Sequence, residues 1–226
     1  MSKVTFYDWK TIDYKEAWDK QQAIFNGVME FKLGKSDISP QSIIFCEHPH
    51  VYTLGKNGNN TNLLISDEML KKINATYYHI DRGGDITYHG PGQIVGYPII
   101  DLESAKLSVR EYIFQLEQSV IDTLAYFGIS STRLEGSTGV WLDVDVPGRT
   151  RKICAIGVKA SRFVTMHGFA FNVNTDLNYF SYINPCGFVD KGVTSMKVEL
   201  GAEVDIELVK SILKVNLYKC LKINEL

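Results

Sequence analysis

The order of helical and extended segments is the feature that most restricts the fold of this chain. The clearest helix runs from Ser108 to Phe127, where apolar residues recur at helical intervals. Ser108 and Glu111 have the spacing of an N-terminal capping box, and Gly128 follows the last apolar position. These signals predict one long amphipathic helix near the middle of the chain.

Two more helices are predicted near the ends. Asp13 and Glu16 are spaced as a capping box at the start of a segment that reaches about Phe31. Asp205 begins a second amphipathic stretch, which predicts a helix that docks at the C-terminal end. The lysines of this last stretch are expected to face solvent: Lys210, Lys214 and Lys219.

Short runs rich in β-branched and aromatic residues lie between these helices and are predicted strands. They are Ser42 to Cys46, Thr76 to Asp81, Ile94 to Ile100, Gly139 to Asp143, Ile153 to Lys159 and Gly168 to Val173. Strands and helices do not alternate one for one, so a mixed, mostly antiparallel sheet flanked by helices is favoured over a doubly wound parallel sheet. We therefore expect an α+β fold in a single domain spanning residues 1–226.

Composition excludes several classes of function. The 226 residues carry a formal net charge of −2, which provides no overall field for holding nucleic acid or an anionic membrane. The N-terminal residues lack the apolar core of a signal peptide, and no stretch has the roughly 18 apolar residues of a membrane span. A cytoplasmic protein without nucleic-acid or membrane partners is expected.

Four cysteines are too few for a disulfide framework and form no CxxC pair. Cys154 and Cys220 lie in a predicted strand and a predicted helix, which suits small buried side chains. Cys186 differs because Pro185 fixes the backbone before it and Gly187 relaxes the backbone after it. This turn fits a presented nucleophile that accepts an acyl group from a thioester, although a buried structural cysteine fits it equally well.

A glycine-rich segment from Arg82 to Gln93 connects two predicted strands. Glycines allow backbone to approach a ligand closely, but they also serve turn geometry alone. The segment has neither the GxxxxGK[ST] pattern nor a GxGxxG that opens a helix, so nucleotide-phosphate binding has no support there. Two interpretations of the segment therefore remain: it forms the wall of a binding pocket, or it is only a hairpin connection between strands.

A basic strip without acidic residues extends from Pro147 to His167. It contains Arg149, Arg151, Lys152, Lys159 and Arg162. Such a strip is commonly a solvated face, yet an ammonium close to a thiol lowers the pKa of that thiol. An ordinary thiol is only a few per cent ionised near neutrality, so one well-placed lysine would raise its reactivity.

Histidines offer two further interpretations. Cys46, His48 and His50 alternate and could share one face as metal ligands, but Pro49 intervenes and no convincing fourth ligand is visible, so no metal is expected. His89 and His167 each precede a glycine, and either could complete a cysteine–histidine pair. The sequence does not show whether either lies near a cysteine.

Several motifs together resemble the bacterial octanoyltransferases, also called lipoyl(octanoyl) transferases or lipoate-protein ligase B, within the biotin and lipoate ligase superfamily. The matching segments are Glu47 to Pro49, Tyr52 to Gly55, Arg82 to Gln93, Lys152 to Gly157, His167 to Asn174 and Ile183 to Gly187. The resemblance implies a twisted sheet flanked by helices, as in the catalytic domain of that superfamily. It also implies transfer of an octanoyl group during protein lipoylation.

The resemblance further implies roles for particular residues. Cys186 would form the acyl-enzyme, and Lys152 would lower the pKa of its thiol and move protons. Substrate would be bound by Arg82, Gly83, Gly84, Asp85, Ile86, Thr87, Tyr88, His89, Ala155, Ile156, Gly157, Gly168, Phe169 and Ala170. No metal, ATP or other cofactor would be required.

The implied donor is octanoyl-acyl carrier protein, and the implied acceptors are lipoyl domains of 2-oxoacid dehydrogenases and the glycine cleavage H protein. The basic strip would suit acidic carrier proteins. Two other functions stay open from the residues: an ATP-dependent lipoate or biotin ligase on the same fold, and a binding module that docks a carrier without catalysis.

Overall fold

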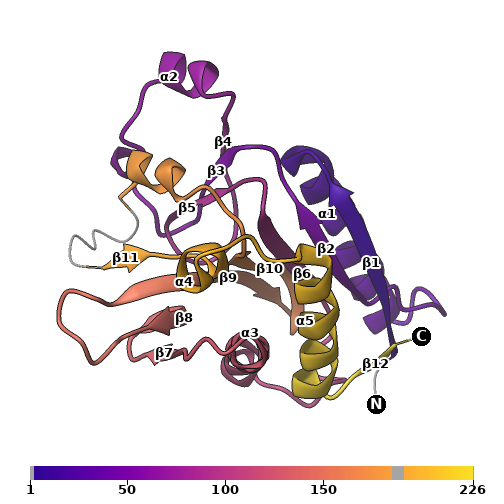
Figure 1. Ribbon diagram of the computed structural model, residues 1–226. Coiled ribbons are helices and arrows are strands. Elements are labelled where there is room, and N and C mark those ends of the chain that lie inside the picture. The colour runs from indigo at the N-terminus through magenta and orange to yellow at the C-terminus, as the bar shows by residue number, and fades with distance from the viewer. Residues whose placement is uncertain (1–2, 185–190, 226) are drawn as a thin grey trace.

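The computed structural model describes residues 3–184 and 191–225, which form two β-sheets with helices packed around them (Figure 1). The larger sheet contains β1 (Lys3–Thr11), β2 (Ser42–Glu47), β6 (Gln93–Ile99), β7 (Thr132–Leu134), β8 (Ser137–Leu142), β9 (Arg151–Ser161), β10 (Val164–Asn172), β11 (Gly192–Val193) and β12 (Asn224–Glu225). Its strand order is β12-β1-β2-β6-β10-β9-β8-β7, with β11 paired to β9. Parallel pairs join β12, β1 and β2 and also β11 and β9, whereas the other pairs are antiparallel. The predicted α+β class with a mixed, mostly antiparallel sheet is confirmed.

The three long helices begin where the sequence predicts. They are α1 (Tyr14–Lys32), α3 (Val109–Tyr126) and α5 (Ile206–Leu221). The Asp13 carboxylate accepts hydrogen bonds from two backbone N–H groups of the first turn of α1, and Asp205 does the same for α5. Ser108 and Glu111 form the reciprocal capping box at the start of α3.

The helices cover both faces of the larger sheet, α1 on one face and α3 with α5 on the other (Figure 1). Strand β2 shows how alternate residues divide between these faces. Ile43 and Phe45 pack in the core beneath α3 and α5, while Ile44 and Cys46 pack against α1. All four are fully buried, which explains why the apolar run of β2 is continuous and not alternating.

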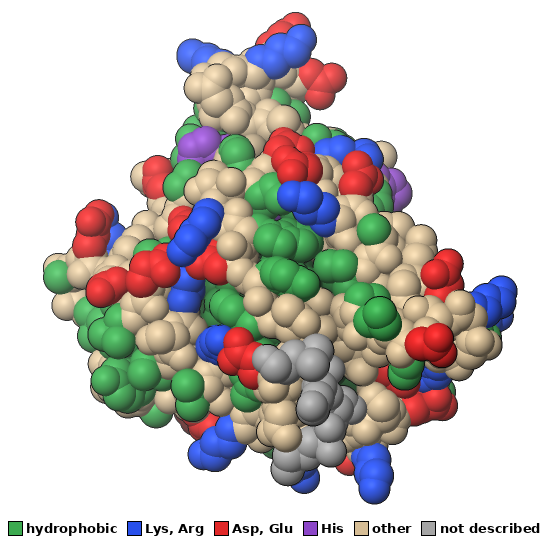
Figure 2. All heavy atoms as spheres, turned by 90° about the vertical axis from the view of Figure 1, so that its right-hand side faces the viewer, with side chains coloured by type: hydrophobic (Ala, Val, Ile, Leu, Met, Phe, Trp, Pro, Cys, Tyr) green, Lys and Arg blue, Asp and Glu red, His purple; other side chains and the backbone are tan. Residues whose placement is uncertain are grey.

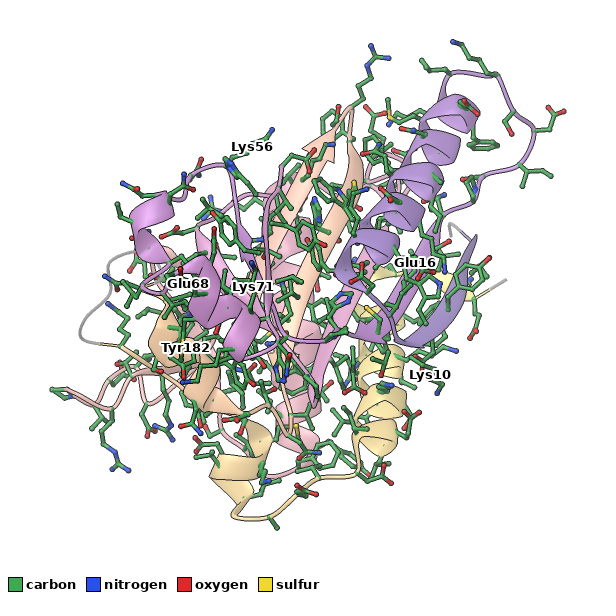
Figure 3. The ribbon with its side chains drawn as sticks, turned by 90° about the horizontal axis from the view of Figure 1, so that it is seen from above. Lys10, Glu16, Lys56, Glu68, Lys71 and Tyr182 are labelled. Carbon is green, nitrogen blue, oxygen red and sulfur yellow. The ribbon has the colours of Figure 1, made fainter. Side chains whose placement is uncertain are left out.

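The smaller sheet forms a separate lobe above the larger one (Figure 1). Its strands are β3 (Val51–Leu54), β4 (Thr76–His79) and β5 (Ile86–His89), in the order β4-β3-β5. Three short helices accompany it, α2 (Asp67–Lys72), η1 (Asn60–Asn62) and η2 (Leu177–Tyr182), and α4 (Met196–Leu200) lies further along the chain. Figure 3 looks down on this lobe, with Glu68 and Lys71 of α2 and Tyr182 of η2 labelled. Leu70 of α2 and Tyr182 belong to the same hydrophobic cluster.

All six predicted strand segments contain strands, but six other strands of the described residues were not predicted: β1, β3, β5 and the short β7, β11 and β12. The longest of them, β1, contains the fully buried Val4 and pairs with β2 and β12. Two more, β3 and β5, belong to the small lobe, and β5 occupies the middle of the glycine-rich segment. The assignment of residues 1–226 to a single domain stays a prediction.

The expectation that Lys210 faces solvent is wrong. Its side chain is buried beneath β1, and its ammonium lies 3.3 Å from Asp8 and 2.9 Å from Glu207. A buried ammonium requires such partners because its hydration is lost. Among the described residues, none of the helices combines the length and the apolar run that crossing a membrane requires.

Candidate active site

A cavity of about 620 Å³ lies where the two sheets meet. Most of its walls come from β5 of the small lobe, from β6, β8, β9, β10 and β11 of the larger sheet, and from η2 and the loop before β5. Tyr14 of α1 and Ile113 of α3 also line it. The volume is within the range of small-molecule binding sites. Aliphatic and aromatic side chains such as Val95, Val158 and Phe169 line it together with polar groups.

Thirteen of the fourteen residues predicted to bind substrate line this cavity. They are Arg82, Gly83, Gly84, Asp85, Ile86, Thr87, His89, Ala155, Ile156, Gly157, Gly168, Phe169 and Ala170. They come from the glycine-rich segment and from two adjacent strands, so the fold brings together residues almost 90 positions apart in the sequence. Their contact with a substrate stays a prediction.

Tyr88 is the exception and faces the core of the small lobe. In β5 the side chains of Thr87 and His89 point to the cavity, and strand alternation directs Tyr88 to the opposite side. The Tyr88 ring stacks on Tyr179 of η2 with centroids 4.9 Å apart, and its hydroxyl lies 2.7 Å from Nδ1 of His50. Tyr88 therefore helps to attach η2 to the small sheet and has a different location from the one predicted.

Glycines let the loop at Arg82 lie directly on β9. A Cβ atom on Gly157 would lie 2.9 Å from the carbonyl oxygen of Gly83 and 3.0 Å from Cδ of Arg82. The Gly83 N–H donates to the carbonyl of Val158 at 2.9 Å, which joins the loop to the strand. Close backbone approach is thus the reason for glycine at these positions.

A second close approach positions Phe169, whose ring lines the cavity. Gly96 of β6 is the cross-strand partner of Phe169, and a Cβ on Gly96 would collide with the Phe169 ring. A Cβ on Gly168 would likewise collide with the carbonyl oxygen of Gly96. The pair of glycines therefore lets the Phe169 ring occupy the space beside Gly96 at the cavity wall.

His89 belongs to a hydrogen-bonded chain beneath the cavity. The Arg82 guanidinium donates to the backbone oxygen and the hydroxyl oxygen of Thr53, at 2.6 and 3.0 Å. The Thr53 hydroxyl lies 3.3 Å from Nε2 of His89, and Nδ1 of His89 lies 2.9 Å from the amide oxygen of Gln93. Burial holds the pKa of His89 well below its usual range, so the ring is neutral.

His167 also lines the cavity and is paired with a carboxylate. Its backbone adopts φ of 59°, in the left-handed region, within β10. Its Nε2 lies 2.9 Å from Oδ1 of Asp81, whose other oxygen lies 2.6 Å from Nζ of Lys159. Burial lowers the pKa of His167 although the neighbouring carboxylate opposes this change.

Lys152 lies near the start of β9 and lines the cavity. It is the cross-strand partner of Trp141 in β8, and Nζ lies 4.5 Å from the centroid of the indole ring. Cys186 lies outside the described residues. The described residues on either side of that segment, Asn184 and Lys191, both line the cavity, and the following Val193 pairs with Lys152.

The basic strip is largely neutralised by acidic residues from other parts of the chain, which the sequence did not indicate. Arg151 donates to both carboxylate oxygens of Glu199 and also to Asp143. Lys159 pairs with Asp81 in the same way. On the face shown in Figure 2, acidic and basic side chains are interspersed and do not form separate areas of one sign.

The residues considered as metal ligands do not converge. His48 is buried, its Nδ1 donates to the carbonyl of Ile12 at 2.7 Å, and its Nε2 accepts from Tyr97 at 2.7 Å. Burial lowers the pKa of His48 to about 4. Cys46 lies 3.5 Å from the same ring, whereas His50 is bonded to tyrosines of the small lobe. In residues 3–184 and 191–225, no three His, Cys, Asp or Glu side chains are grouped as a metal site requires.

Comparison with known families decides where this chain belongs. Residues 13–217 match the model of the lipoyl protein ligase A/B catalytic domain. The chain belongs to this family. An octanoyltransferase of Bacteroides fragilis (strain YCH46) is 57% identical over 203 residues, covering 90% of this chain and 91% of the relative. One from Parabacteroides distasonis is 54% identical over 215 residues, covering 95% and 96%.

Solved structures agree with the fold of this family. The bipartite lipoate protein ligase of Thermoplasma acidophilum superimposes with a TM-score of 0.70 over 100% of this chain and 86% of that chain. The Plasmodium falciparum protein LipL1, solved with lipoate, has a TM-score of 0.71 over 98% of this chain and 66% of that chain. Identities of 14% and 10% mean that these likenesses concern the fold, and the predicted ligase-like fold is confirmed.

Sequence reasoning missed several residues in or next to the cavity, among them Trp141 and Thr53. Trp141 was recognised only as part of a strand, although its ring contacts the predicted catalytic lysine. Thr53, which connects Arg82 with His89, lay in a motif for which no role was given. A glycine inside a predicted strand, Gly139 two residues before Trp141, was a signal for the first, because such a glycine often marks a close approach of a neighbouring group.

Proposed function

We propose that this chain is an octanoyltransferase that moves an octanoyl group from octanoyl-acyl carrier protein to a lysine of lipoyl domains, through a thioester on Cys186. Membership of the lipoyl protein ligase A/B family and relatives named octanoyltransferase support the transfer. One structural observation carries the assignment of the site. Lys152 and the described residues on either side of Cys186 line one cavity together with the glycine-rich loop.

The connection along the chain limits how far Cys186 can be from the cavity. An extended chain advances at most about 3.6 Å per residue, so a position two residues after Asn184 lies within about 7 Å of it by covalent geometry alone. Asn184 itself is held by a hydrogen bond from its N–H to the carbonyl of Asn62, and Ile183 forms a β-bridge with Leu63. These contacts hold the chain beside the cavity just before the segment that contains Cys186, which supports the proposed nucleophile.

The proposed chemistry is two acyl transfers. In the first, the Cys186 thiol gives its proton to Lys152, and the thiolate attacks the thioester carbonyl of the donor. The carrier thiolate leaves and takes a proton, so a thioester is exchanged for a thioester without an energy source. In the second, the amine of a lipoyl-domain lysine attacks the acyl-enzyme, an amide forms, and the Cys186 thiol is restored.

The cavity walls suit the acyl chain and the reacting carbonyl differently. Apolar groups such as Ile156, Val158 and Phe169 offer contact to an eight-carbon chain, because burial of each methylene contributes about 0.8 kcal/mol. Backbone N–H groups near the glycine-rich loop are proposed to stabilise the oxyanion of the tetrahedral intermediate. The hydrogen-bonded chain from Arg82 to Gln93 keeps this wall rigid.

The finer details of partners and location belong to the same proposal. The acceptors are lipoyl domains of 2-oxoacid dehydrogenases and the glycine cleavage H protein, and the reaction takes place in the cytoplasm. The enzyme uses no metal and no ATP. An ATP-dependent lipoate or biotin ligase on the same fold is the alternative, and it would release pyrophosphate from ATP in the presence of free lipoate or biotin.

Intact-mass analysis after mixing with octanoyl-acyl carrier protein tests the proposal. The wild-type protein is expected to gain the mass of one octanoyl group, and Cys186→Ala is expected to gain none. Cys154→Ala and Cys220→Ala are matched controls, because both thiols are buried and should leave the adduct in place. An octanoyl adduct that survives in Cys186→Ala would refute the assignment of the nucleophile.

A further inference from the structure

His167 is a buried residue of the cavity wall that uses only one of its two ring nitrogens within the chain. The residue is 2% exposed, and its Nε2 lies 2.9 Å from Oδ1 of Asp81. The hydrogen bond from His167 and the ammonium of Lys159 hold the pKa of Asp81 below its ordinary range, so this carboxylate only accepts. Burial lowers the pKa of His167 and keeps the ring neutral. The ring proton therefore lies on Nε2, and Nδ1 is an acceptor.

This acceptor is buried without a partner. Within residues 3–184 and 191–225, Nδ1 of His167 makes no hydrogen bond although solvent does not reach the atom in the closed structure. Buried polar side-chain atoms are rarely left in this state. Because the residue lines the cavity, a hydrogen-bond donor on a bound ligand is the natural partner of Nδ1.

The backbone at His167 is also held in an uncommon conformation. Its φ of 59° lies in the left-handed region although the residue is inside β10, and this interrupts the alternation of side chains along the strand. The His167 N–H donates to Oε1 of Gln21 in α1 at 3.2 Å, which supports the conformation. Strain of this kind persists where the surroundings fix it, and it is concentrated at ligand sites.

His167 and Lys152 mark opposite ends of the cavity. His167 is the cross-strand partner of Val158, which follows Lys152 by six residues in β9. A strand advances about 3.3 Å per residue, so the two ends are separated by roughly 20 Å along the strand. An octanoyl chain has seven carbon–carbon bonds of about 1.5 Å and is shorter than about 11 Å. A chain whose carbonyl lies at the Lys152 end therefore covers about half of this length.

The cavity floor between the two ends consists of small residues. They form two cross-strand pairs of β9 and β10, Ala155 with Ala170 and Gly157 with Gly168, and all four line the cavity. Such a floor leaves room for an extended hydrocarbon chain. Beyond it the surroundings become polar, because the ion pair of Asp81 with Lys159 adjoins the ring of His167.

We propose that His167 is a specificity-determining residue that accepts a hydrogen bond from a terminal hydroxyl of an acyl chain, so that the cavity also takes ω-hydroxyacyl chains longer than octanoyl. This inference rests on the proposed function, which places the acyl carbonyl at the Lys152 end. A terminal hydroxyl donates to Nδ1, whereas a terminal methyl at the same place leaves the buried acceptor unpaired, which is unfavourable. A plain octanoyl chain stops short of His167. Binding alone is involved, and no covalent bond changes.

Isothermal titration calorimetry with free fatty acids tests this inference without requiring transfer. The probes are octanoate, decanoate and dodecanoate, and the same acids with a hydroxyl on the last carbon. The hydroxylated acid is expected to bind about three- to tenfold more tightly than the plain acid at ten or twelve carbons, the range that one hydrogen bond gives. No such advantage is expected at eight carbons, because that hydroxyl does not reach His167.

Two substitutions separate the ring nitrogens of His167. His167→Gln can still donate to Asp81 from its amide but has no acceptor at the Nδ1 position, so the hydroxyl advantage is expected to disappear. His167→Asn retains a polar atom near the Nδ1 position and suits the left-handed backbone, so it is expected to keep more of the advantage. His79→Gln is the matched control, since His79 is exposed on β4 and does not line the cavity.

The methyl ethers of the hydroxy acids provide a test that needs only the wild-type protein. An ether oxygen cannot donate, so these acids are expected to lack the advantage, and this comparison stays decisive if a variant does not fold. Absence of a hydroxyl advantage at every length, including absence of measurable binding, overturns the inference, and so does an advantage that persists in His167→Gln. The two proposals fail differently: a wild-type protein that forms no octanoyl adduct contradicts the proposed function, whereas normal adduct formation without a hydroxyl advantage contradicts only the role of His167.

Discussion

A methyl group on Gly157 should distort the cavity wall and lower both stability and transfer. The Cβ of Gly157→Ala would lie 2.9 Å from the carbonyl oxygen of Gly83, about half an ångström inside the 3.4 Å at which ordinary contact begins. Because the opposing atom is backbone, the loop must move and the 2.9 Å bond from Gly83 to Val158 must lengthen. Overpacking of this kind costs about 1–3 kcal/mol in the free energy of unfolding.

The loss of octanoyl transfer is expected to exceed the loss of folded protein. A displacement of about half an ångström at a wall that orients the substrate should lower kcat/KM by about tenfold, since a misplacement of 1 Å can cost about a hundredfold. Urea unfolding gives the first quantity and steady-state transfer gives the second. Gly192→Ala is the stability control, because its Cβ would meet nothing closer than 3.6 Å. Gly157→Ala with wild-type stability and rate would refute the reasoning.

Two further predictions concern charged groups outside the cavity. Lys210→Ala should lower the free energy of unfolding by about 1–3 kcal/mol, because it removes the buried ammonium that Asp8 and Glu207 share and leaves Asp8 only the exposed Lys10 as a partner. The more exposed Lys214→Ala should change it by less than about 0.5 kcal/mol, and chemical denaturation measures both. Arg151 holds the pKa of Glu199 below its ordinary value of 4.5, so the stability that this carboxylate contributes is present above pH 4.5 and is lost as the pH falls through the lowered pKa. Stability of Glu199→Gln should therefore depend less on pH below 4.5 than that of the wild type, and equal slopes in acid unfolding would contradict this.

Local signals in the sequence predicted the helices well. Asp13, Ser108 and Asp205 each accept hydrogen bonds from the first turn of a helix, and these bonds depend only on residues within three positions. The burial of Lys210 could not be predicted from such local signals. Helical spacing separates an apolar stripe from a polar face, but the burial of Lys210 depends on Asp8, about 200 residues earlier, whose carboxylate accepts a hydrogen bond from its ammonium.

The candidate site shows the same division between local and distant information. The glycine-rich segment was recognised because glycines mark close approach, and most of it lines the cavity. Tyr88 entered the predicted set with the whole range that the resemblance implies, whereas the middle of the segment is a strand whose alternation directs this side chain away from the cavity. The contact between Trp141 and Lys152 depends on the register of β8 against β9, which includes an irregularity next to Trp141. The register between two strands cannot be predicted directly from a single sequence.

The internal pairing of the basic strip bears on how a carrier protein would find this enzyme. Arg151 and Lys159 already form ion pairs with carboxylates of their own chain, so they add little long-range attraction for an acidic carrier protein. Recognition would then depend on shape and short-range contacts around the cavity mouth. The association rate should accordingly change little between low and high ionic strength, in contrast to encounters that are guided by opposite charges.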